Sequence, residues 1–390
     1  MSSNDSFQQA YQQMQESLKK GSLRRDLQGR RGADNQQRKF AEREIEYDDQ
    51  GRKIPRPMFL RPEDIAKGKD YDVEKVLFTT LGQQKGDRPR RITRDDILAF
   101  QDNILLLKDQ YKKGITIQNI VNLSLQDDID RANEQIYLAV PLSRKSGLVH
   151  FLTNAGPNSK AQNHHVEVEF SNFNSVVFDI KKEAIATVKN RIANGKIKFE
   201  CDCERHTFWF RYMATIGGYG LGRQEGGFPK VRNPHLSGVA CKHVLRVVHW
   251  ILSPAGIQYL KKQVEVERTK QVGARYKQSD AKVKDQLNQQ MADLESGKAK
   301  PITPNIQKAE QEMIRRANKV AKKYFADQLK QMKQAELDLR KASIQAQLNA
   351  VLHTFNKDQQ REINKTVDSW VKGKMSDFSF DIFMRGLNVK

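Results

Sequence analysis

Apolar side chains recur at helical spacing in the stretch that follows Thr93. Thr93 is followed by Asp95 and Asp96. A threonine cap and acidic residues in the first turn both stabilise a helix start, so the pattern predicts a helix from this point. The apolar stripe consists of Ile97, Leu98, Phe100, Ile104, Leu105 and Leu107. A second apolar run at 115–125 and the segment 128–140 predict helix or mixed structure. Residues 56–145 are therefore predicted to be mainly helical.

A period of two replaces the helical period in the next part of the chain. Leu148, His150 and Leu152 alternate with Val149 and Phe151. At 166–170 apolar residues alternate with polar ones, which is the pattern of a half-buried strand, so both segments are predicted to be strands. Helical spacing returns at 181–194, where Ile185, Val188 and Ile192 share one face. Residues 146–254 are therefore predicted to be a β-rich domain.

The two ends of the chain differ from this centre. Residues 1–55 are rich in Gln, Arg, Asp and Ser, which predicts a polar extended or disordered arm with a short helix within 7–18. Residues 255–390 are charged and helical in pattern, and Pro301 and Pro304 divide them. An amphipathic stripe that needs a partner runs through Ile306, Ala309, Met313, Ala317, Val320 and Tyr324. A late apolar cluster, suited to docking onto a neighbour, comprises Phe378, Phe380, Ile382, Phe383 and Met384.

Composition and charge narrow the function classes. The chain has 390 residues, 38% of them hydrophobic, and a net charge of +21 that is spread along the chain. Such a field favours polyanions, of which nucleic acid is the commonest, although an acidic protein partner fits as well. Three cysteines are too few for a disulfide framework. No signal peptide and no membrane span are expected, so the protein is predicted to be made in a reducing cytoplasm and to be kept there at least initially.

All three cysteines belong to one motif. Cys201 and Cys203 are followed, after 37 residues, by Cys241 and His243. Three thiolates and one imidazole are a common structural ligand set for Zn²⁺. Cys201 and Cys203 can share a metal only if the chain turns sharply at Asp202. His206, His235 and His249 remain alternatives for the fourth ligand.

The surroundings of the motif suggest further structure. A helix is predicted to open at Cys241 and to end at Ser253 and Pro254. The alternation at 207–212 favours a strand packed in the core over a base-stacking surface. The glycine-rich part of the insert, 217–227, lacks a phosphate-binding spacing and favours a long β-connection with positive φ angles. Lys230, Arg232, Lys242 and Arg246 suit phosphate contacts and a solvated face equally. The pair at 164–165 is expected to be exposed.

The metal motif resembles the SWIM-type zinc finger, a small ββα zinc domain. The resemblance covers roughly 196–254 and implies Cys201, Cys203, Cys241 and His243 as the zinc ligands. It also implies a module for interaction with DNA or protein. The insert is long for a plain member of that family.

A wider resemblance, to a group of tailed-phage virion proteins, spans about 100–260. It rests on the segments 147–151, 201–212, 228–234 and 238–244. It implies a particle component near the portal, the neck or the packaged DNA.

The sequence thus predicts an α+β protein with an N-terminal arm, a central mixed α/β body with a ββα-like zinc knuckle, and a long helical C-terminal region. The predicted function is that of a non-enzymatic virion structural protein. Its expected partners are portal, capsid or neck proteins, further copies of itself and packaged DNA, without a membrane. The alternative is a cytoplasmic SWIM-type DNA-binding regulator, and an enzyme ranks third because no paired carboxylates or Ser-His-Asp pattern stand in a recognisable setting.

Overall fold

The structure is a computed structural model that describes residues 3–20, 46–47, 53–54, 78–84, 86–179, 185–270 and 273–387. By internal contacts the chain divides into two compact units, Met1–Met313 and Ile314–Lys390. Helices and an antiparallel sheet are both present, which confirms the predicted α+β class. The four sequence regions, with boundaries at 55, 145 and 254, stay a prediction.

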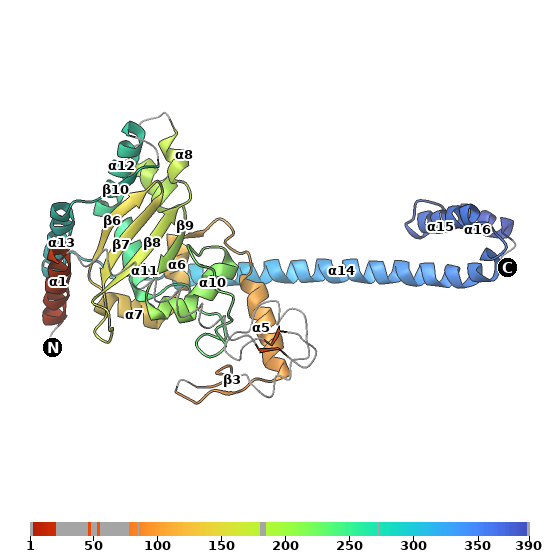
Figure 1. Ribbon diagram of the computed structural model, residues 1–390, viewed down its shortest axis with the longest axis horizontal. Coiled ribbons are helices and arrows are strands. Elements are labelled where there is room, and N and C mark those ends of the chain that lie inside the picture. Colours follow the sequence, from red (N-terminus) through yellow and green to blue (C-terminus); the bar gives the residue numbers. More distant parts are fainter. Residues whose placement is uncertain are drawn as a thin grey trace. The chain divides into compact units, whose positions relative to one another are not determined.

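A six-stranded antiparallel sheet forms the centre of the first unit (Figure 1). Its strands in spatial order are β10 (Arg275–Lys277), β6 (Ala139–Lys145), β7 (Leu148–Asn154), β8 (Asn163–Phe170), β9 (Lys196–Cys201) and β5 (Ile115–Thr116). The strands predicted at 148–152 and 166–170 are confirmed as β7 and β8. Strand β10 was not predicted, because three residues between helices give no recognisable alternation.

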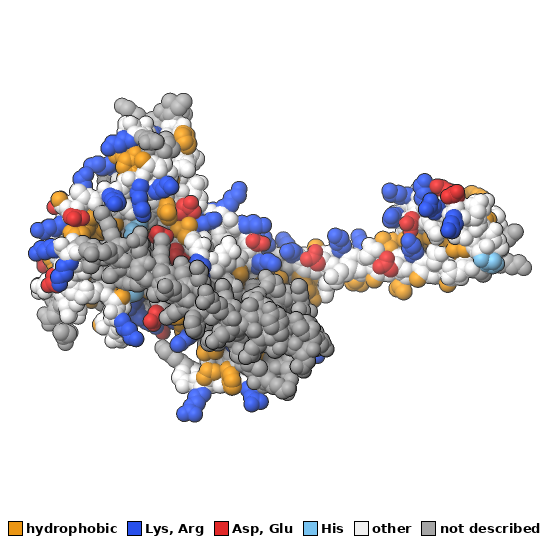
Figure 2. Space-filling model, in the orientation of Figure 1, with side chains coloured by type: hydrophobic (Ala, Val, Ile, Leu, Met, Phe, Trp, Pro, Cys, Tyr) orange, Lys and Arg blue, Asp and Glu red, His pale blue; other side chains and the backbone are white. Residues whose placement is uncertain are grey.

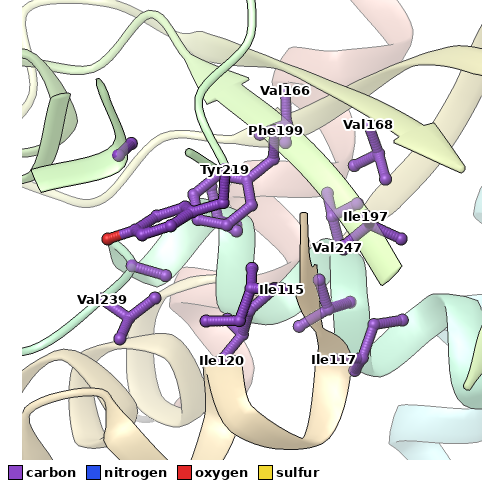
Figure 3. Packing of buried hydrophobic residues seen from close by; sticks show 14 of the residues in the cluster. Ile115, Ile117, Ile120, Val166, Val168, Ile197, Phe199, Tyr219, Val239 and Val247 are labelled. Atoms are coloured by element: carbon purple, nitrogen blue, oxygen red, sulfur yellow. The ribbon is translucent and has the colours of Figure 1, made fainter. Parts of the chain in front are cut away.

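One face of the sheet holds the main hydrophobic core. Alternate side chains of β8 and β9, among them Val168 and Phe199, point to this face and are fully buried. They pack with residues of α6 (Ile117–Leu123) and α11 (Lys242–Leu252), as Figure 3 shows for Ile120 and Val247. Helices α7 (Gln126–Gln135) and α12 (Pro254–Thr269) add to this layer. Cys201, Cys203 and Cys241 are part of this core.

The opposite face of β6 and β7 is covered by two helices from distant parts of the sequence. Phe7 and Met14 of α1 (Ser3–Lys19) and Val283 and Leu287 of α13 (Asp280–Glu295) pack with Leu152 and its neighbours. The short helix expected within 7–18 is thus confirmed. The first part of the predicted arm is packed against the sheet, and 21–45, 48–52 and 55–77 lie outside the described residues.

The helix predicted after Thr93 is confirmed as α5 (Arg94–Leu107). The Thr93 side chain accepts from the Asp96 backbone N–H, and the Asp96 carboxylate accepts from the Thr93 N–H at 2.8 Å. Arg90, in the short strand β4 (Arg90–Arg91) that pairs with β3 (Phe78–Thr79), grips both carboxylate oxygens of Asp96 at 2.7 Å. This double fixation sets where the helix begins.

The strand expected at 207–212 is absent, and this prediction was wrong. His206–Phe210 form a π-helical turn, η2, that continues into α10 (Arg211–Gly217). The side chains of His206, Phe210, Ala214 and Gly217 are buried at steps of three and four residues, which is a helical period. The alternating aromatic residues at 208–212 suggested a strand with one buried face. Phe208 is instead 58% exposed, so these aromatic residues do not share a buried face.

The helix predicted at 181–194 is confirmed in its described part. It consists of α9 (Ile185–Val188) and a π-helical turn, η1 (Lys189–Ala193), while 180–184 lie outside the described residues. The buried side chain of Ile192 packs into the main core. A short helix, α8 (Phe173–Val177), connects this part to β8.

A buried ion pair ties α12 to the sheet. Arg144 of β6 and Glu267 of α12 are both almost completely buried and form an ion pair. Arg144 also donates to Gln263 Oε1 at 3.1 Å, and Glu267 accepts from the Gly273 N–H at 2.7 Å. The segment after residue 254 is therefore an integral part of the first unit.

Helices are the regular secondary structure of the second unit within its described residues, and short turns join them. The long helix α14 (Ile306–Leu352) begins in the first unit, after Pro301 and Pro304, and the second unit adds α15 (Lys357–Val371) and α16 (Asp377–Gly386). Trp370 stacks on Phe380 with ring centroids 4.1 Å apart. Part of the late apolar cluster is covered in this way by the unit itself. Within the described residues, no helix is long and apolar enough to cross a membrane.

Candidate metal centre

The four residues of the Cys/His motif come together at the junction of β9 and α11. Cys201 is the last residue of β9, and Cys203 follows one residue later. Cys241 is the N-cap of α11, and His243 lies in the first turn of that helix. Their ligand atoms all lie within 4.8 Å of one another. The helix predicted to open at Cys241 and to end at Ser253 is confirmed.

The donor set fits a tetrahedral metal ion. All four residues are buried, with exposed fractions of at most 3%. Both ring nitrogens of His243 are buried without a hydrogen-bond partner, and a buried polar atom of this kind needs a ligand. A tetrahedron with metal–sulfur distances of about 2.3 Å has edges of about 3.8 Å, a spacing compatible with this cluster. The cluster can therefore hold one metal ion.

The electrostatics of the cluster also favour a cation. Burial raises the pKa of the Cys201 and Cys203 thiols well above the usual value of 9. At Cys241, hydrogen bonds from Cys201 and Cys203 outweigh burial and lower the pKa. Burial lowers the pKa of His243 to about 4, so its ring is neutral at pH 7, as a metal ligand must be. A bound cation offsets the cost of burying the thiolates.

Asp202 holds the sharp turn between the first two cysteines. Its Oδ1 accepts from the His165 backbone N–H at 3.0 Å and lies 2.9 Å from His164 Nδ1. Its own backbone N–H donates to the His165 carbonyl oxygen at 3.2 Å. The turn that the Cys-x-Cys spacing required is thus anchored on β8.

The expectation of an exposed His164–His165 pair was wrong. The two residues are 8% and 2% exposed, because β8 is paired on both sides and Asp202 lies over them. The His164 ring lies against the His243 ring, with centroids 4.3 Å apart, and His165 Nδ1 lies 2.8 Å from His150 Nε2. The sequence feature that could have indicated this burial is Asp202, because the Cys-x-Cys motif places its carboxylate at the turn.

Ser159, His164 and Asp202 are connected in the order of a catalytic triad. Ser159 Oγ lies 3.2 Å from His164 Nε2 and accepts from the Ala161 backbone N–H at 3.2 Å. Because the His164 ring packs on His243 and its Nδ1 contacts Asp202, we interpret the chain of contacts as support for the metal loop.

The three alternative ligands lie outside the cluster. His206 Nε2 lies 3.3 Å from Glu200, and its backbone N–H donates to Cys203 Sγ at 3.3 Å, so it supports a ligand without being one. His235 is exposed, and His249 lines a separate pocket.

Two further ion pairs brace the cluster, and sequence reasoning missed both. Arg211 contacts Glu200 at 2.6 Å, beside His206. Arg205 holds both oxygens of Asp128 at 3.1 and 2.8 Å and lies 3.4 Å over the Trp209 ring. Each pair joins residues of the insert to a neighbouring element, and no motif marks such pairs in a sequence.

The basic residues near the motif do not form one solvated face. Lys242 Nζ donates to Gln135 Oε1 at 2.6 Å, and Arg246 Nη2 donates to the Ala132 carbonyl oxygen at 2.8 Å. Both side chains are drawn toward α7 because α11 packs against that helix. Lys230 is 7% exposed, and burial lowers its pKa to about 8.

The glycine-rich insert runs along β9 rather than forming a phosphate loop. The Phe199 N–H donates to the Tyr219 carbonyl oxygen, and the Leu221 N–H donates to that of Phe199, each at 3.1 Å. Gly218 has a φ of 80°, and a Cβ there would lie 2.9 Å from Lys112 Cα, so this position requires glycine. The expected positive φ angles are confirmed at Gly218 and Gly222, while the first part of the insert is helical.

Comparisons with known proteins give no family for this chain: no family model matches it, and neither the curated proteins nor the solved structures contain a match.

Proposed function

We propose that this chain is a non-enzymatic, zinc-stabilised structural protein of a tailed-phage virion that joins neighbouring virion proteins. The observation that carries the assembly part of the proposal is an exposed apolar row on α14. The virion context rests on the sequence resemblance described above. The zinc part rests on the ligand set and its burial.

The apolar row occupies one side of α14 within the second unit. It consists of Ile314, Phe325, Leu329, Met332 and Leu339, whose spacing places them within a narrow sector of the helix. Each of these side chains is more than half exposed, with 67% for Phe325 and 69% for Met332. Figure 2 shows hydrophobic side chains at the surface along this helix. An apolar row of this length favours a protein interface.

The charges beside the row indicate what covers it. Residues 314–333 include seven Lys and Arg side chains and one acidic side chain, Asp327. Two copies of this segment side by side would bring like charges together. We therefore propose that the occupant is an acidic, apolar-striped segment of a neighbouring virion protein. Packaged DNA is a second proposed partner of the chain, since its net charge of +21 attracts polyanions.

The metal centre supports a structural role for zinc. Four protein ligands complete a tetrahedron, whereas a catalytic zinc site keeps one position open for water or substrate. The three cysteines belong to the main core, and His243 is buried as well. The proposed zinc therefore joins β9 to α11 and takes no part in a reaction.

Elemental analysis of protein prepared without chelator tests the zinc proposal. We expect one zinc per chain, and we expect Cys241→Ser to lose the metal because one ligand is removed. His235→Ala is the matched control, since His235 is exposed and lies outside the cluster. Protein without metal, or equal loss in the control, would exclude a zinc centre.

Purified particles test the assembly proposal. We expect mass spectrometry to find the chain as a stoichiometric virion component. A full-length triple variant, Phe325→Ser, Leu329→Ser and Met332→Ser, should keep its thermal midpoint yet be excluded from particles. Phe208→Ser is the matched control, because Phe208 is an exposed aromatic residue of the first unit and does not belong to the row.

Two outcomes would contradict the assembly proposal. One is incorporation of the triple variant at the wild-type copy number. The other is absence of the wild-type chain from particles, which would favour the alternative of a SWIM-type DNA-binding regulator.

A further inference from the structure

A pocket of about 530 Å³ opens between α11, the start of α12 and α13. Its volume lies in the range of small-ligand sites. Arg246, His249 and Trp250 of α11 form one wall, and Gln286 and Leu294 of α13 lie opposite. Lys298 and Lys300, which follow α13, stand exposed at the rim. The pocket is separate from the Cys/His cluster.

Arg246 differs from three other arginines that are buried or half-buried near the sheet. Arg144, Arg205 and Arg211 each form an ion pair with a carboxylate. Arg246 donates to the Ala132 carbonyl oxygen, its Nε is buried without a partner, and within the described residues no carboxylate forms an ion pair with it. A buried guanidinium without a counterion is unfavourable. Burial accordingly lowers the pKa of Arg246 to about 10.

The charges around the pocket leave room for an anion with more than one negative charge. Arg246, Lys298 and Lys300 line it, against Asp293 as the one acidic residue among the described lining residues. Phosphate monoesters carry close to two negative charges at pH 7 and bind well to arginine.

The remaining surface suits a planar, polar group. Tyr137, Trp250, Leu252 and Leu294 supply apolar contact, and the buried Gln286 Oε1 has no hydrogen-bond partner. The His249 ring is neutral at pH 7, because burial lowers its pKa to about 4. An amide and a neutral imidazole can hydrogen-bond to the edge of a nucleobase.

We propose that this pocket binds a nucleoside monophosphate group, with the phosphate at Arg246, Lys298 and Lys300 and the base between α11 and α13. Such a group occurs both as a free nucleotide and as the 5′-phosphorylated end of a nucleic acid strand. The inference is independent of the assembly proposal, because none of these residues belongs to the apolar row of α14.

Titration calorimetry on the full-length, metal-loaded protein tests the proposal. The probes are dAMP, deoxyadenosine, inorganic phosphate, and one short oligodeoxynucleotide with and without a 5′ phosphate. We expect dAMP to bind at least about tenfold more tightly than deoxyadenosine, because charged hydrogen bonds to the phosphate are lost without it. Binding of the 5′-phosphorylated strand in preference to dAMP and to the unphosphorylated strand would identify a strand end as the source.

Substitutions at the rim test whether the probes bind in this pocket. The double variant Lys298→Ala, Lys300→Ala should weaken binding roughly five- to tenfold, from the worth of two exposed charge contacts. Lys282→Ala, Lys284→Ala on α13 removes the same charge from exposed positions outside the pocket and should leave binding unchanged. Arg246→Lys keeps the positive charge but loses the paired N–H donors of the guanidinium, so it should also weaken binding.

Four results would overturn the proposal. They are no binding of any phosphate-bearing probe, equal binding of deoxyadenosine and dAMP, equal binding of inorganic phosphate and dAMP, and equal loss in the Lys282/Lys284 control.

Discussion

Asp202 shows how much a single side chain decides at the metal centre. The ligand spacing demanded a turn after Cys201, and the Asp202 carboxylate holds that turn against β8 through His164 and the His165 backbone. The four ligand positions could be predicted because thiol and imidazole residues have few other reasons to cluster. The burial of His164 could not be predicted, because it depends on which strands pair with β8.

A second carboxylate, that of Asp96, gives a prediction that depends on pH. Arg90 lowers the pKa of Asp96 below its usual value of 3.8. A lowered pKa in the folded state stabilises the fold above the unfolded pKa, and this contribution is lost as the pH falls through the folded value. We expect Asp96→Asn to lower the free energy of unfolding at pH 7 by about 1–2 kcal/mol, through loss of the cap and of Arg90.

Denaturant unfolding at pH 7 and at pH 2–3 measures this effect. The difference between wild type and Asp96→Asn should shrink at the lower pH. Asp95→Asn removes an exposed acid from the same turn and should have an effect below about 0.5 kcal/mol. A difference that stays constant with pH would show that Asp96 does not act through its charge.

Among the elements, those with strong local signals were predictable. The Thr93 cap marked α5, and apolar spacing after Cys241 marked α11. The turn η2 was misread as a strand because alternating aromatic residues at 208–212 imitate the period of two. Strand β10 carries no local signal, since its position depends on pairing with β6.

The ion pair between Arg144 and Glu267 stabilises the attachment of α12, and of the chain that follows it to β10, to the sheet. We expect Glu267→Gln to lower the free energy of unfolding by about 3–5 kcal/mol, because the buried Arg144 charge loses its counterion. Thermal or denaturant unfolding measures the change. Glu265→Gln, on the same helix, is the control, because Glu265 is 58% exposed. Equal effects of the two variants would refute this role for the buried pair.

For the molecule as a whole, the predicted class was correct because the change from helical to alternating periods is local. The division into units at 313/314 depends on packing between segments that are distant in the sequence, such as α1 on α13. A local sequence pattern therefore could not predict it. The second unit has a core of its own, in which Leu348, Val367 and Phe380 take part.

These separate cores predict a selective response to metal removal. A chelator should reduce amide hydrogen-exchange protection in 196–252 by at least roughly tenfold, since metal-binding energy contributes directly to folding there. Protection in 357–386 should stay unchanged, because the described core residues of the second unit include none of the four ligands. Exchange measured by mass spectrometry checks both regions in one sample. Equal loss in both regions would contradict the independence of the two cores.

The 37 residues between the two ligand pairs also affect the order of events during folding. Closing a chain segment of this length costs about 1 kcal/mol more entropy than closing one of about twelve residues, as in a compact zinc finger. This added cost favours a folding order in which α10 and the glycine-rich segment pack onto β9 before the two ligand pairs meet. We therefore expect the metal to bind late in folding, at a rate that depends on closure of this chain segment more than on the metal concentration.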